Sequence, residues 1–185
     1  MKYDSDTFCD QYPLAIYFVQ HLAYYRASKA AFDDLGMKSA YWAATLSSYL
    51  MLAAIHWCKV FGSHGCNATH WKHVATADVD NLQDQFRARV LTVTGLSKTE
   101  WERYHRQMCD FRNKFIAHRD RKYKAPVPDF DVALGVVYAY DDWIRELIRP
   151  DYYDGPTLRE KFDHWRTTSG PIAEQAMKAT NGMKE

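Results

Sequence analysis

The segment 97–115 constrains the fold most strongly, because it combines a helix start with a helix-spaced apolar seam. Ser97 and Glu100 form a capping box, in which each side chain accepts a hydrogen bond from a backbone N–H that the first turn leaves free. The apolar residues that follow recur at spacings of three and four: Trp101, Tyr104, Met108, Phe111 and Phe115. The pattern predicts an amphipathic helix with one buried face.

Similar signals predict helices along most of the chain, whereas strand-like alternation is almost absent. Gly36, Gly62 and Gly95 follow periodic apolar stretches, as expected at helix ends. A second capping box, at Thr157 and Glu160, predicts a C-terminal helix. The expected helices span 13–34, 38–61, 79–93, a segment after Ser97, 130–148 before Pro150, and a segment after Thr157. The segments 63–77, with a short helical turn, and 122–129 are expected to be loops.

These elements predict an all-α fold, an up-and-down bundle of four to five main helices with a C-terminal helical extension. We expect the bundle in residues 1–150 and the extension in 151–185, where about the last fifteen residues are polar and predicted to fray. Hydrophobic residues make up 47% of the chain, which argues against disorder.

The stretch 39–58 contains no charged residue and is long enough to cross a bilayer. Polar side chains such as Ser47, Ser48 and His56 interrupt it, so we predict a buried central helix and no membrane partner. The N-terminus lacks an apolar run behind a basic patch. The four cysteines are therefore expected to be reduced thiols of a cytoplasmic protein.

A local basic cluster follows the apolar seam, although the whole chain carries a net charge of only +1. Between 112 and 124, Asp120 is the sole acid, and the basic residues are Arg112, Lys114, Arg119, Arg121, Lys122 and Lys124. Arginine binds phosphate well, and histidine, here His118, moves protons near neutral pH. The cluster predicts a phosphate-bearing substrate, with RNA as the expected class.

Arg112 and His118 lie six positions apart. On an ideal helix this separates them by ~9 Å along the axis and about 120° around it. One straight helix therefore cannot place both groups on a single phosphate atom. Either the helix loosens before His118, or a two-fold homodimer brings the groups of two chains together and supplies a general acid and a general base.

The motif Arg112-Asn113 with Ala117-His118-Arg119-Asp120, late in a bundle helix, resembles the HEPN superfamily in its abortive-infection branch. That resemblance implies a homodimeric, metal-independent endoribonuclease of phage defence or toxin–antitoxin systems, with a cognate antitoxin as a possible partner. It implies cleavage to 2′,3′-cyclic phosphate and 5′-hydroxyl ends without a cofactor.

The same resemblance implies the residue roles. His118 would move the proton, Arg112 would stabilise the transition state and Asn113 would orient the phosphate or His118. The residues expected to hold backbone phosphates are Lys114, Arg119, Arg121 and Lys122.

Three alternatives remain open at this point. His118 also continues the seam spacing, so it could be a buried histidine that closes the core. Some HEPN relatives are catalytically silent modules that mediate dimerisation or bind a partner or nucleotide. A metal-dependent hydrolase could use the histidine-rich loop, although the spacings of Cys58, His64, Cys66, His70 and His73 match no common zinc pattern. No Cys–His pair is indicated by the sequence.

Overall fold

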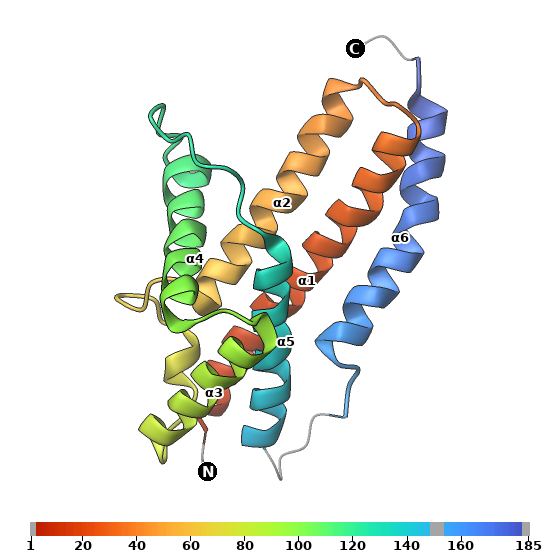
Figure 1. The fold of residues 1–185 in the computed structure, drawn as a ribbon. Coiled ribbons are helices and arrows are strands. Elements are labelled where there is room, and N and C mark those ends of the chain that lie inside the picture. Colours follow the sequence, from red (N-terminus) through yellow and green to blue (C-terminus); the bar gives the residue numbers. More distant parts are fainter. Residues whose placement is uncertain (1–2, 149–153, 183–185) are drawn as a thin grey trace.

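The computed structural model describes residues 3–148 and 154–182, and this part of the chain is all-α, as predicted (Figure 1). The six α-helices are α1 (Ser5–Asp34), α2 (Ala40–Phe61), α3 (Val79–Thr94), α4 (Lys98–Asp110), α5 (Phe130–Leu147) and α6 (Leu158–Thr180). A short 3₁₀-helix spans Trp71–His73, and a π-helix, Phe111–Ala117, continues α4. Both predicted capping boxes are confirmed at the starts of α4 and α6.

Two groups of helices build the molecule. Helices α1, α2 and α6 lie side by side, with α1 in the middle (Figure 1). Helix α3 packs on α5, and α4 packs on the C-terminal half of α2 before it diverges from that helix (Figure 1). Large aromatic side chains fill the core where the two groups meet, including Trp57, Tyr140 and Trp143. No helix in the described residues is both long and apolar enough to span a membrane.

Helix α1 begins earlier than the sequence predicted. Pro13 favoured a start at that position, yet the helix starts at Ser5 after Asp4, whose carboxylate accepts a hydrogen bond from the Thr7 N–H. The added turns are held by Gln11, which is fully buried and donates to the His70 carbonyl. Asp4 is a local N-cap signal that the prediction overlooked, whereas the partner of Gln11 lies 59 positions away in the chain.

The prediction of a buried central helix holds for only part of α2. Ala53, Trp57 and neighbouring residues of its C-terminal half are buried, as is Cys58. One face of the helix remains open from its N-terminal half to past its middle, with Tyr41 66% exposed and Leu52 38% exposed. The absence of charge in the stretch 39–58 predicted burial on all sides, but the tertiary structure covers only one side of α2 over much of its length.

The predicted fraying of the last fifteen residues is wrong within the described part. Helix α6 continues to Thr180 because Ala173 and Met177 are buried against the end of α1. The Trp42 indole N–H also donates to the Thr180 hydroxyl at 2.9 Å. The expected helix 130–148 is confirmed by α5, whose C-cap residue is Ile148, whereas Pro150 and the expected boundary at residue 150 lie outside the described residues.

Candidate functional site

The backbone changes its hydrogen-bonding pattern where the predicted motif begins. Helix α4 ends at Asp110, and residues Phe111–Ala117 form a π-helix. The His118 N–H closes it by donating to the Asn113 carbonyl, five residues back, at 3.0 Å. The spacing of Arg112 and His118 left two alternatives, a loosened helix or a homodimer. The π-helix shows that the helix loosens before His118.

The wider turn of the π-helix carries the apolar seam out of the core. Phe111 is buried and stacks on Phe115 with ring centroids 5.2 Å apart, but Phe115 is 48% exposed. His118, which follows on the same seam, is exposed. The alternative that His118 is a buried histidine closing the core is therefore wrong.

The three predicted catalytic residues face different surroundings. Arg112 lines a cavity of about 400 Å³ together with Cys58 and Lys59. Asn113 lines a separate cavity of about 800 Å³. Among the described residues, no hydrogen bond or ion pair joins Arg112 to His118. Loosening of the helix thus exposes His118, which lines neither of these two cavities.

The predicted phosphate-binding residues form an exposed basic surface at the end of the π-helix. Lys114, Arg119, Arg121 and Lys122 are all exposed, and Lys114 also pairs with Asp110 at 3.1 Å. The Asp120 carboxylate accepts a hydrogen bond from the Lys122 N–H, so it orders the turn. This turn follows the π-helix that continues α4, and it lies away from α1 and α6 (Figure 1).

The larger cavity lies between the end of α2, the 3₁₀-helix, α3 and α4. Its charged lining residues are the four cations Lys72, Arg87, Lys98 and Arg106 and the two acids Glu102 and Asp110. Aromatic side chains that include Trp71 and Trp101 form part of its wall. The cavity is therefore suited to a partner that is anionic or neutral rather than cationic.

A cluster of thiols and an imidazole lies on the wall of this cavity. The Cys109 sulfur is 4.0 Å from Nε2 of His105, and the Ser63 hydroxyl donates to it at 3.9 Å. The Cys58 thiol donates to the carbonyl of Met108, the residue before Cys109, at 3.8 Å. One hydroxyl donor, one imidazole and a second thiol therefore surround a half-buried sulfur.

These contacts perturb the proton affinities of the cluster. The neighbouring Cys58 thiol lowers the pKa of Cys109, burial acts against it, and the nearby His105 and Ser63 lower it further. The interaction with Cys109, together with burial, raises the pKa of Cys58. Burial lowers the pKa of His105, but its bonds to Cys109 and to backbone carbonyls outweigh this and raise the pKa overall.

The sequence reasoning missed this pairing. Its one local signal is the spacing of His105 and Cys109, which are four apart and therefore neighbours on one helix face. The other two members come from the end of α2, Cys58, and the residue after Gly62, Ser63. No sequence pattern places those residues beside α4.

The histidine-rich loop holds a compact group of imidazoles. The His64 ring lies 4.8 Å from that of His70 and 4.7 Å from that of His73. His70 is buried, and burial together with the charges of His64 and Lys72 lowers its pKa to about 3. Its Nδ1 accepts a hydrogen bond from the Lys72 N–H. In residues 3–148 and 154–182, no group of three or more His, Cys, Asp or Glu side chains is arranged to hold a metal ion.

Comparisons of the chain with protein-family models, with curated proteins and with solved structures found no match. The HEPN resemblance therefore depends on the motif residues themselves and on the helical fold around them.

Proposed function

We propose that this protein is a metal-independent endoribonuclease that cleaves RNA to 2′,3′-cyclic phosphate and 5′-hydroxyl ends, in phage defence or a toxin–antitoxin system. The observation that carries the proposal is the π-helix Phe111–Ala117, which ends at an exposed histidine inside a basic surface. π-Helical turns are rare and occur frequently at functional sites. Here the π-helix coincides with the residues of the sequence motif.

The chemistry assigns one role to each group. His118 takes the proton of the ribose 2′-hydroxyl or returns one to the 5′-oxygen that leaves, and its exposure leaves it free to reach RNA. Arg112 stabilises the extra negative charge on phosphorus in the transition state, and Asn113 orients the phosphate. The exposed basic residues after the π-helix hold the backbone, so binding weakens as salt rises.

A homodimer supports this chemistry because, within one chain, Arg112 lines the smaller cavity and His118 does not. The open face of α2 carries Tyr41, Ala44, Ser48, Leu52, Ile55 and Lys59, spaced three or four apart. The last two of these residues line the small cavity that contains Arg112. A second copy packed on this largely uncharged face would lie beside Arg112 and could present its own His118 there.

The first test is cleavage of an end-labelled structured RNA in EDTA. We expect wild type to leave cyclic-phosphate ends and the variant with Arg112→Ala and His118→Ala to be inactive. A matched control replaces an exposed pair of the same residue types on α6, His164→Ala with Arg166→Ala, and should cleave as wild type does. Equal cleavage by wild type and the motif variant, or none by either, contradicts the proposal and favours a silent binding module.

Mixing the two single variants tests the composite site. If each site takes Arg112 from one chain and His118 from the other, random pairing restores about a quarter of the sites. If both groups act within one chain, the mixture stays inactive. Activity that requires added metal would instead support the hydrolase that uses the histidine-rich loop.

A further inference from the structure

The cluster around Cys109 has no role in RNA cleavage, yet it combines the features of a reactive thiol. The Ser63 hydroxyl donates to its sulfur and the His105 imidazole lies 4.0 Å from it, and both groups stabilise a negative charge there. Cys109 is half-buried and lines the cavity of about 800 Å³, so small molecules can reach it. Thiolate character and access together determine how readily a cysteine is oxidised.

A second thiol next to the first distinguishes this cluster from a hydrolytic Cys–His pair. Cys58 comes from α2, is 2% exposed, donates to the carbonyl of Met108 beside Cys109, and interacts electrostatically with the Cys109 thiol. It is shielded from solvent and has Cys109 as its thiol neighbour, so it is placed to react with that residue after oxidation. Reactive sensor cysteines are often poised next to such a resolving thiol.

We propose that Cys109 is a hydroperoxide-reactive thiol and that Cys58 captures its oxidised form, which joins α2 to α4 by a disulfide. The substrate class is a small neutral hydroperoxide, which the open cavity admits and its positive lining does not repel. This chemistry goes beyond the proposed ribonuclease and needs no RNA.

In the first step the Cys109 thiolate attacks one peroxide oxygen. A sulfur–oxygen bond forms, the oxygen–oxygen bond breaks, and the leaving hydroxide takes a proton from His105 or from water. The sulfur is oxidised to a sulfenic acid, and the peroxide is reduced to water.

In the second step the Cys58 sulfur attacks the sulfenic sulfur. A disulfide forms, the sulfur–oxygen bond breaks, and the hydroxyl leaves as water with the Cys58 proton. Cys109 and burial raise the pKa of Cys58, and the Arg112 guanidinium opposes part of that rise, which assists this step once Cys109 no longer carries a charge.

The test treats the reduced full-length protein with hydrogen peroxide and maps its thiols by mass spectrometry without reduction. We expect a peptide that links Cys58 to Cys109. In Cys58→Ser or Cys58→Ala, we expect a sulfenic acid on Cys109 that dimedone traps. The exposed thiols Cys9 and Cys66 provide matched controls, and Cys9→Ser and Cys66→Ser should form the disulfide as wild type does.

The mapping of wild type needs no variant, so a failure of Cys58→Ser to fold does not affect it. A Cys58–Cys66 link, a link between chains, or faster oxidation of Cys9 or Cys66 than of Cys109 overturns the proposal. So does an unchanged pair of thiols at a peroxide concentration that oxidises the exposed cysteines.

Discussion

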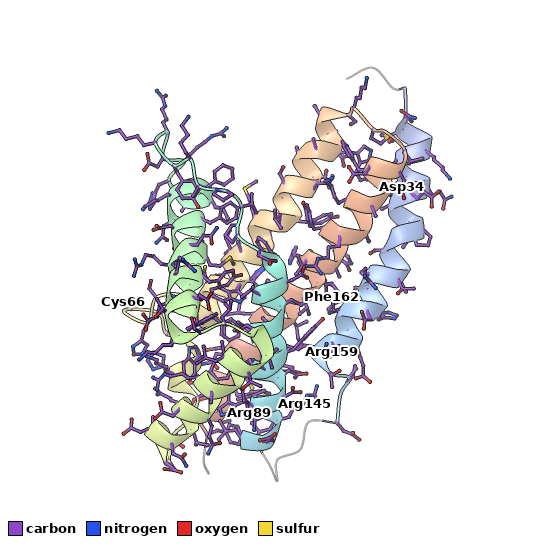
Figure 2. All side chains as sticks on the ribbon, viewed as in Figure 1. Asp34, Cys66, Arg89, Arg145, Arg159 and Phe162 are labelled. Carbon is purple, nitrogen blue, oxygen red and sulfur yellow. The ribbon has the colours of Figure 1, made fainter. Side chains whose placement is uncertain are left out.

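Two polar clusters in this molecule, one at Asp141 and one at Cys109, differ in how fully their central group is satisfied. Asp141 is 2% exposed and accepts hydrogen bonds from the Tyr12 hydroxyl and the Leu158 N–H, each at 2.7 Å, and from Nε of Arg145 at 2.9 Å. Arg145 also donates to carbonyls just before α6 (Figure 2).

Cys109, in contrast, has only longer contacts, with His105 at 4.0 Å and Ser63 at 3.9 Å, and its side chain lines a cavity. A carboxylate whose acceptor sites are filled and shielded from water holds helices together. A sulfur that is partly satisfied and accessible retains a lone pair for chemistry. The difference indicates that the Asp141 cluster stabilises the fold, whereas the Cys109 cluster is free to react.

The largest effect is expected from Asp141→Ala. The change leaves Arg145, Tyr12 and the Leu158 N–H without their shared acceptor, so the free energy of unfolding should fall by about 3 kcal/mol. Urea denaturation measures it. The exposed neighbour Asp142→Ala is the matched control and should change little. A loss below about 1 kcal/mol for Asp141→Ala would mean that the cluster does not hold the helices together.

An intermediate effect is expected on the reactivity of Cys109. Because its pKa is lowered, its alkylation rate by iodoacetamide should stay nearly constant as the pH falls from about 8 to about 6. His105→Asn removes one stabilising contact and raises the pKa of Cys109, so the rate near pH 6 should drop to roughly half of the rate near pH 8. Mass spectrometry follows each thiol, with the exposed Cys66 as an internal reference. Equal rates in both proteins would exclude His105 as the group that activates Cys109.

The smallest effect is expected at an exposed ion pair. Arg89 and Glu146 join α3 to α5 at 3.0 Å, but both side chains are partly in water (Figure 2). Glu146→Gln should therefore change the free energy of unfolding by less than about 1 kcal/mol, again by urea denaturation. A loss as large as that of Asp141→Ala would show that burial of the charge is not what separates the two pairs.

Local sequence signals predicted most of the elements. The capping boxes at Ser97 and Thr157 and the glycines after α2 and α3 identified helix ends within a few residues. These signals act within one or two turns, so the sequence contains them directly. The end of α6 was missed because a distant partner, Trp42, holds it. The start of α1 was missed although Asp4 caps it locally, and the first turns are also held by the distant His70 carbonyl.

The candidate site shows the same contrast between features that local sequence signals predict and features that depend on distant contacts. The residue types at Arg112, Asn113 and His118 and the basic run after them were read from the sequence, and their catalytic roles stay predictions. The exposure of His118 could not be read, because a π-helix changes the phase of the side chains without a recognised sequence signal. Nor could the sequence separate the cavities on which Arg112 and Asn113 lie.

By itself, then, the sequence determined an all-α chain, its main helices and a concentrated basic segment, because periodicity, caps and charge are local properties. Only the tertiary structure decided that α2 keeps one open face, that Asp141 is sealed, and that Cys58 and Ser63 meet Cys109 and His105. Those outcomes depend on which helices pack together, and the packing minimises exposed apolar surface over the whole chain rather than within any one segment.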